Sequence, residues 1–147
     1  MSFFLSSEPT PLAKGLGYAG LVPFVLPAAF LWIAPINSRP WLTTALTAYA
    51  ALIATFLGGI HWGMAAHRPQ NARAFHYVWG VTPSLIAWLC LIVPAPAALP
   101  VLALLLCACY LVDRNSYKTS GWSAWLPMRL QLTTGAAGSC LIGAGAI

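Results

Sequence analysis

Long apolar runs separated by short polar stretches dominate this chain. Within each run the hydrophobic residues are continuous and do not alternate, which over this length is typical of helices. A helix needs roughly 17–25 mostly apolar residues to cross a bilayer, and lipid admits only helices or closed barrels. The pattern therefore predicts an all-α membrane protein, a bundle of five transmembrane helices. Their expected spans are residues 15–34, 42–66, 77–93, 97–112 and 130–147.

The polar stretches between the runs are short, so neighbouring helices are expected to pack antiparallel in one domain, residues 15–147. The longest stretch, 113–129, carries Tyr117, Trp122 and Trp125. Aromatic side chains favour the headgroup region, so we interpret it as an interfacial cytoplasmic loop, with a solvated loop as the alternative. Residues 1–14 are polar and lack the basic start of a signal peptide. We expect them to form a cytoplasmic N-terminal segment.

Charge placement predicts the orientation of the five spans. In this topology six of the seven Lys and Arg residues lie on the side of the N-terminus, and only Arg39 lies on the opposite side. An excess of basic residues marks the cytoplasmic side. We therefore expect a multi-pass protein of the bacterial inner (cytoplasmic) membrane, with its C-terminus on the far side. The six residues are Lys14, Arg68, Arg73, Arg114, Lys118 and Arg129.

The composition narrows the function classes. Residues are 60% hydrophobic and 6% charged, against about 25% charged in soluble domains. The net charge of +5 comes from a shortage of acids, Glu8 and Asp113, and the basic residues are scattered, so a nucleic-acid partner is not expected. The four cysteines form no CxxC pair or Cys/His cluster. No metal site is therefore predicted.

A histidine inside the second span is the main candidate for chemistry. His61 occurs in FLGGIHWG, residues 56–63, and an ionisable group at membrane depth is a hypothesis about function. It precedes Arg68 by seven residues, which places it about 10 Å inside the boundary. Asp113 and Arg129 border the same side, and Tyr110 lies one turn deeper. The candidate polar or ligand site is His61, Trp62, Tyr110, Asp113 and Arg129.

Small residues spaced four apart predict where helices pack closely. The histidine lies about 160° around the helix from Gly59 and from Gly63, so the second helix is expected to be central, with protein on both sides. Pro23 and Pro83 fall inside the first and third spans and are expected to kink them. The predicted packing residues are Gly59 and Gly63 in the second span and Gly135, Ser139 and Gly143 in the fifth.

Several sequence blocks resemble one protein family, the domain of unknown function 3429. The resemblance covers about residues 15–133, and its most specific block is the Gly-Gly-Ile-His-Trp of residues 58–62. It implies a small multi-helix protein of bacterial or mitochondrial membranes, and it implies no activity. The blocks are residues 16–24 (LGYAGLVPF), 56–63 (FLGGIHWG), 83–88 (PSLIAW), 110–114 (YLVDR) and 125–133 (WLPMRLQLT).

The residues favour a non-enzymatic accessory, assembly or scaffold component of a larger membrane complex, because no Gly-x-Ser-x-Gly, phosphate-loop or metal motif occurs. The alternative is a small hydrophobic-ligand-binding or proton-linked protein with a polar site around His61. Heme would require two axial histidines on facing helices, and the depths of His67 and His76 do not match that of His61. No cofactor is expected. The expected partners are the lipid bilayer and either membrane proteins or further copies of the chain.

Overall fold

A computed structural model describes residues 8–67 and 69–147, and none of these residues lies in a β-strand. Four helical segments are long and apolar enough to cross a membrane, namely Pro11–Ile33, Ile36–His67, Ala74–Ile92 and Ala95–Ser120. The last helix has 19 residues but is less apolar, since it contains Arg129, Gln131 and several Gly, Ser and Thr residues. The α-helices of the described ranges are α1 (Pro11–Ala19), α2 (Val22–Ile33), α3 (Arg39–His67), α4 (Ala74–Ile92), α5 (Ala95–Ser120) and α6 (Leu126–Ala144).

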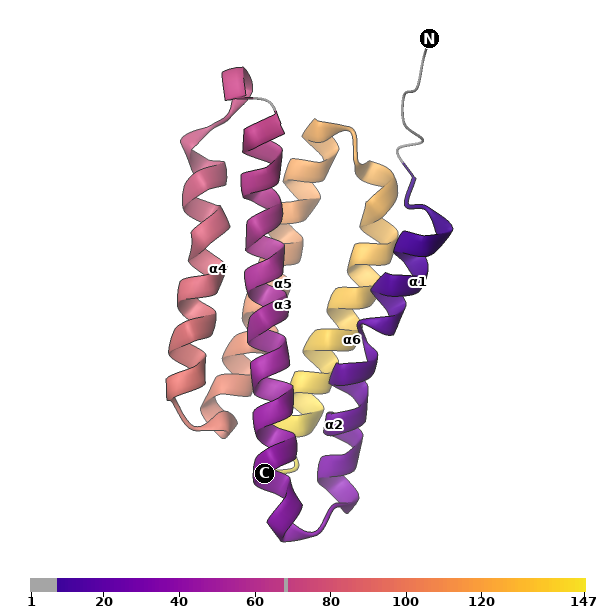
Figure 1. Cartoon of the computed structure of the whole chain (residues 1–147), viewed down its shortest axis with the longest axis vertical. Coiled ribbons are helices and arrows are strands. Elements are labelled where there is room, and N and C mark those ends of the chain that lie inside the picture. The colour runs from indigo at the N-terminus through magenta and orange to yellow at the C-terminus, as the bar shows by residue number, and fades with distance from the viewer. Residues whose placement is uncertain (1–7, 68) are drawn as a thin grey trace.

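The helices run up and down in one elongated bundle (Figure 1). Helix α3 lies in the middle and contacts α2, α4, α5 and α6. The α3–α4 and α5–α6 connections lie at the end of the bundle where α1 begins, and the C-terminus lies toward the other end. Residues 1–7 of the predicted N-terminal segment and Arg68 lie outside the described residues.

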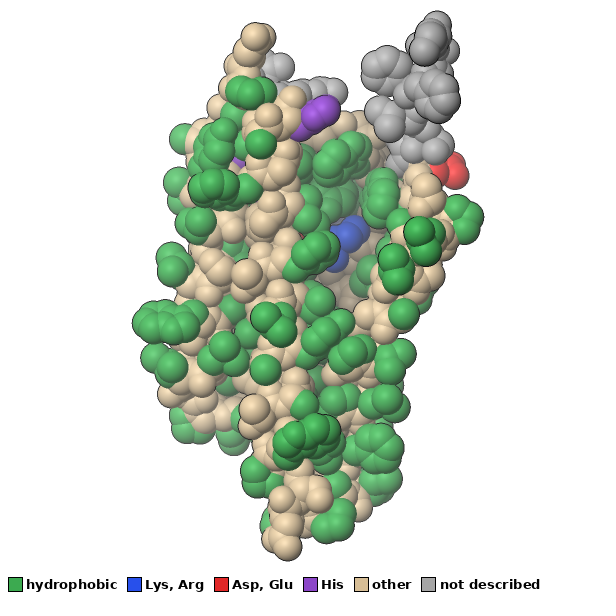
Figure 2. Space-filling view, in the orientation of Figure 1, with side chains coloured by type: hydrophobic (Ala, Val, Ile, Leu, Met, Phe, Trp, Pro, Cys, Tyr) green, Lys and Arg blue, Asp and Glu red, His purple; other side chains and the backbone are tan. Residues whose placement is uncertain are grey.

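Apolar side chains fill the bundle and also cover its outside. Leu31, Leu46, Leu99 and Leu102 are fully buried between helices. Large hydrophobic side chains also point outward, as Figure 2 shows for one face, and Leu104 is 71% exposed. A water-soluble monomer rarely exposes large contiguous apolar surface. Together with the four candidate spans, this surface identifies an integral membrane protein solvated by lipid.

The first apolar segment is not one helix, because it breaks between α1 and α2. Pro23 has no N–H to donate to the carbonyl of Ala19, the last residue of α1. At the same break Phe24 N bonds to the carbonyl of Leu21, and the carbonyl of Gly20 accepts a hydrogen bond from Tyr49 Oη of α3 at 3.0 Å. A neighbouring helix thus satisfies the exposed backbone, as a chain in lipid requires. Helix α1 begins at Pro11, inside the segment expected to be a polar N-terminal stretch.

The stretch 113–129, expected to be a loop, is mostly helical, which corrects the sequence analysis. Helix α5 continues through Asp113 to Ser120, and α6 already begins at Leu126. The charge of Asp113 does not end the helix, because the side chain is buried, paired with Arg129 of α6 and in contact with His61 of α3. Helix α5 ends instead at Gly121, whose φ of 80° is left-handed and favours glycine.

In α3 the glycine that packs against a neighbouring helix is Gly58, one residue before the predicted Gly59. A Cβ added to Gly59 or Gly63 would meet nothing within 4 Å, so these two residues do not face a described neighbour. Gly58 does, because a Cβ there would lie 2.6 Å from the carbonyl oxygen of Gly80 on α4. In α6, by contrast, Gly143 lies against Leu46, with an added Cβ 2.5 Å from it. Gly135 faces Leu21 of the α1–α2 turn and Ser139 is buried.

Candidate functional site

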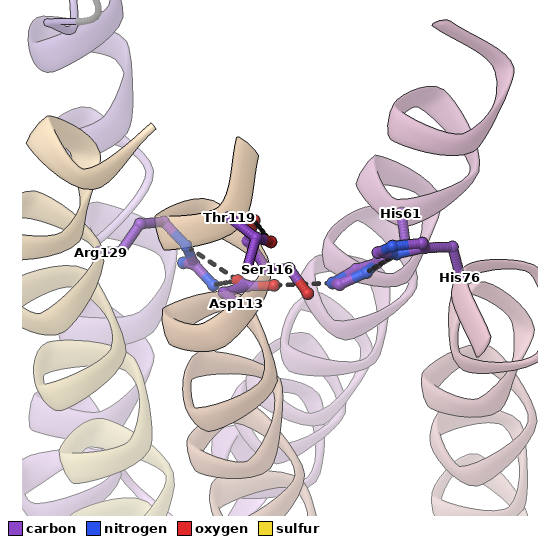
Figure 3. Close-up of polar contacts among 6 residues, drawn as sticks. All are labelled: His61, His76, Asp113, Ser116, Thr119 and Arg129. Atoms are coloured by element: carbon purple, nitrogen blue, oxygen red, sulfur yellow. Dashed lines mark hydrogen bonds and ion pairs between the residues drawn. The ribbon is translucent and has the colours of Figure 1, made fainter. Parts of the chain in front are cut away.

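Four helices each contribute one charged or titratable side chain to a polar row inside the bundle (Figure 3). His61 of α3 and His76 of α4 lie on one side of Asp113 of α5, and Arg129 of α6 lies on the other. His61 and Asp113 are 0% exposed and Arg129 is 8% exposed. We call these four residues the polar row. It lies six residues, or about 9 Å, from the end of α3.

Asp113 is held from both sides. Its Oδ2 accepts hydrogen bonds from Arg129 Nε at 3.2 Å and from Arg129 Nη2 at 2.5 Å. Its Oδ1 lies 2.9 Å from His61 Nε2. A buried charge is costly unless it is paired and hydrogen-bonded, and here the carboxylate and the guanidinium cancel. The Asp113–Arg129 pair therefore joins α5 to α6 without a net charge inside the bundle.

The carboxylate also fixes the proton positions on the histidines. An ionised carboxylate only accepts hydrogen bonds, so His61 Nε2 carries a hydrogen and donates it to Asp113. In a neutral His61 the other nitrogen, Nδ1, is then an acceptor. It lies 3.3 Å from His76 Nδ1, which donates in that state. The two rings lie nearly parallel, with planes 25° apart and centroids 5.5 Å apart.

A polar cavity of about 440 Å³ gives the row access to one end of the bundle. It lies between the α3–α4 hairpin and the last turns of α5, and His76 is part of its lining. Ser116 and Thr119, drawn beside the row in Figure 3, also line it. His76 therefore joins a polar, open space to the fully buried His61.

Two of the five predicted site residues lie outside the polar row. Trp62 is 49% exposed and donates from Nε1 to the carbonyl of Tyr77 at 3.0 Å. It follows His61 directly and so points about 100° away around the helix. Tyr110 is half-buried and lies about 4.5 Å deeper than Asp113 along α5. The structure brings together the other three, His61, Asp113 and Arg129.

His76 was not among the predicted site residues, because its depth was expected to differ from that of His61. The sequence does contain a signal for this residue, namely its distance from the turn between the second and third spans. His61 comes eight residues before Pro69 and His76 comes seven residues after it. In an antiparallel hairpin, residues equally far from the turn lie at equal depth. Among the described residues, the row contains no group of three His, Cys, Asp or Glu side chains able to hold a metal.

The fold and the polar row define a multi-pass, all-helical membrane protein. The family model described as "Protein of unknown function (DUF3429)" matches residues 9–145, and the chain belongs to this family. Transmembrane protein 69 of Xenopus tropicalis is 39% identical over 92 residues, which make up 60% of this chain. The match spans only 35% of that relative's length. No solved structure matches the chain.

Proposed function

We propose that this protein is a proton-responsive, non-enzymatic accessory component of a bacterial inner-membrane complex. In this proposal five spans cross the membrane, with the N-terminus cytoplasmic. Helix α6 supports the fifth span, since its 19 residues reach about 28 Å, close to the hydrocarbon thickness of about 30 Å. The basic residues described near the α1 end of the bundle support the orientation. They are Lys14, Arg73, Arg114, Lys118 and Arg129.

The contact between His61 and His76 carries this proposal. Histidine changes charge near neutral pH, and Nε2 of His76 is the nitrogen left to take a proton from the polar cavity. When it does, the hydrogen between the two Nδ1 atoms moves from His76 to His61. His76 is then neutral again, and His61 is an imidazolium hydrogen-bonded to Asp113 at 2.9 Å. One proton has entered, and no bond other than N–H has changed.

The proton alters the charge of the bundle interior. Without it, Asp113 and Arg129 cancel; with it, the polar row carries one positive charge at membrane depth. That charge is attracted to the Asp113 carboxylate and weakens the hold of the carboxylate on Arg129. Since the four residues come from four helices, proton uptake changes how α3–α4 is held against α5–α6. A partner bound to either pair of helices would sense this change.

Nitrogen NMR of histidine in the bilayer-embedded protein tests proton uptake directly. Between pH 5 and pH 8 the imidazole shifts of His61 and His76 are expected to move together, with one proton shared by the pair. His76→Leu removes the second ring, and His61 is then expected to stay uncharged over the whole range. His67→Leu is the matched control, because His67 is an exposed residue at the end of α3. Its loss should remove only its own signals.

Two results would refute this function. One is a wild-type protein in which neither His61 nor His76 changes charge between pH 5 and pH 8. The other is a His76→Leu variant in which His61 titrates as in the wild type. Either result would show that the contact between the rings is only structural. The polar row would then be a set of interhelical hydrogen bonds that specify helix packing.

The exposed face of α3 supports the accessory part of the proposal. Gly59 and Gly63 leave open space around the backbone, and small residues allow a second helix to approach closely in lipid. Gly63→Leu should therefore deplete proteins that co-purify with the wild type, as measured by quantitative mass spectrometry. Leu104→Ala, a change at an exposed position on a different helix, α5, should not. Equal recovery of partners with both variants would count against an accessory role at this face.

Reporter fusions test the span count. Fusions within residues 34–38, after residue 94 and at the C-terminus should be active with a periplasmic reporter. Fusions near residue 70 and residue 122 should be active with a cytoplasmic one. If the C-terminal fusion and the fusion near residue 122 report the same side, α6 does not span the membrane and the five-span topology is wrong.

A further inference from the structure

A second cavity opens on the side of the bundle, away from the histidines. It has a volume of about 410 Å³, and its lining residues come from α1, α2, α3, α5 and α6. Phe24, Ile53, Leu57 and Leu132 belong to its largely apolar lining. Figure 2 shows a hollow on this face, rimmed by hydrophobic side chains and with basic atoms at its floor. We call this cavity the lateral groove.

Two polar side chains at the bottom of the lateral groove have unused hydrogen-bonding capacity. Arg129 lines the groove, and two of the five N–H hydrogens of its guanidinium bind Asp113. A further one binds the hydroxyl of Tyr117, which also lines the groove, so the guanidinium still has hydrogens for another acceptor. Thr133, one turn further along α6, also lines the groove and is 7% exposed. Its Oγ1 is buried without a hydrogen-bond partner among the described residues. A buried hydroxyl without a partner is destabilising, so the site suits an incoming oxygen atom.

The charge at the floor of the groove selects the kind of head group. The positive charge of Arg129 is already cancelled by Asp113, so an anion would bring an uncompensated charge into an apolar site. A carbonyl oxygen brings none and can accept hydrogen bonds from both the Arg129 guanidinium and Thr133 Oγ1. The apolar walls then take the hydrocarbon part of the same molecule. Cavities of 300–1,000 Å³ with few polar groups are typical of small-molecule sites.

We propose that the lateral groove binds an uncharged lipid-soluble molecule whose carbonyl oxygen is held by Arg129 and Thr133. This site uses hydrogens of Arg129 that do not bind Asp113, and it does not depend on whether the histidines titrate. The ligand enters from the lipid phase and lies with its carbonyl at the depth of the polar row. The protein is then a receptor for a neutral lipid as well as a responder to protons.

Three C18 probes that differ in the head group test this assignment: methyl oleate, oleate and 1-octadecene. Each is incubated at pH 8 with purified protein in detergent, and the amount retained after size exclusion is measured by mass spectrometry. About one methyl oleate per protein is expected, with at least fivefold less 1-octadecene and at least fivefold less oleate. Equal retention of 1-octadecene would overturn recognition of the carbonyl. Greater retention of oleate would show that the site binds anions.

Variants place the ligand within the groove. Ile53→Trp fills the groove and should reduce retention of methyl oleate at least fivefold, whereas Leu52→Trp, at a 66% exposed position on the outer face of α3, should not. Thr133→Val removes only the unpartnered hydroxyl. It should reduce retention at least threefold while leaving the melting temperature unchanged or higher. Unchanged retention with both Ile53→Trp and Thr133→Val would overturn the site, and Thr133→Val decides alone if Ile53→Trp does not fold.

Discussion

Replacing Asp113 by Asn tests whether the bundle depends on charge compensation. The change keeps the shape of the side chain and leaves an oxygen able to accept from His61 Nε2, now at 2.9 Å from Oδ1. It removes the negative charge beside Arg129, which is 8% exposed. The loss of stability in Asp113→Asn therefore reports mainly on a guanidinium left buried without its counter-ion.

The two interactions of Asp113 differ in expected magnitude. Removing one partner of a buried ion pair costs about 3–5 kcal/mol. An interhelical hydrogen bond in a membrane protein contributes about 0.6 kcal/mol on average and at most about 1.7 kcal/mol. Asp113→Asn should therefore lower the free energy of unfolding by about 3–5 kcal/mol, and His61→Ala should lower it by less through its hydrogen bond. Since Arg129 makes both of its bonds to Oδ2, the charge term dominates.

A double-mutant cycle of Asp113 and Arg129 separates the energy of their charge interaction from the other effects of each substitution. Arg129→Met alone leaves a buried carboxylate, whereas Asp113→Asn with Arg129→Met leaves no charge in the pair. Unfolding by SDS in mixed micelles, followed by circular dichroism, should give a coupling free energy of about 2–3 kcal/mol. Glu8→Gln, at the other acidic residue, which is exposed, should change stability by less than about 0.5 kcal/mol. Single variants whose effects add within about 0.5 kcal/mol would refute the reasoning.

Two glycine positions give further predictions, each measurable as thermal unfolding in detergent. Gly58→Ala should destabilise by about 1–3 kcal/mol, because its Cβ would lie 2.6 Å from the backbone oxygen of Gly80. Gly59→Ala, its neighbour in open space, should be neutral or up to about 1 kcal/mol stabilising, and equal effects of the two would contradict the packing. Gly121→Ala should cost about 1–2 kcal/mol, because its φ of 80° disfavours a Cβ. A Gly121→Ala variant as stable as the wild type would show that α5 does not need this left-handed end.

Counting depth along the helices predicted the joining of His61, Asp113 and Arg129 from sequence. Depth follows from the rise per residue and the length of each connection, and a buried charge needs a partner at its own level. The direction in which each side chain of α3 points around the helix axis was harder to predict. Apolar residues occur all around this helix, so hydrophobicity does not distinguish its buried face from its exposed one. For this reason Trp62 was included in the site although it lies outside the polar row, and Gly59 was chosen for packing in place of Gly58.

The end of α5 could not be read from polarity. A run such as Asp113-Arg114-Asn115 is typical of a helix leaving the membrane, and the sequence analysis ended the span at residue 112. The helix continues because Asp113 accepts hydrogen bonds from His61 and Arg129 on other helices. The sequence of α5 alone does not contain this information. The signal that does mark the end is Gly121, whose φ is positive. Tertiary pairing therefore overrides local hydrophilicity where charges compensate.

The register of each helical hairpin, that is, which residues of its two helices face each other, relates the predicted contacts to those that were not predicted. In an antiparallel pair of helices, the numbers of facing residues have a nearly constant sum. In α3–α4, Gly58 with Gly80 gives 138 and His61 with His76 gives 137, and both pairs are in contact. One known pair thus predicts the others along the hairpin. In α5–α6, Asp113 with Arg129 gives 242, and the same sum places Thr133 level with Cys109. Because Cys109 is buried and its thiol is a weak hydrogen-bonding group, this register leaves the Thr133 hydroxyl without a strong partner on α5.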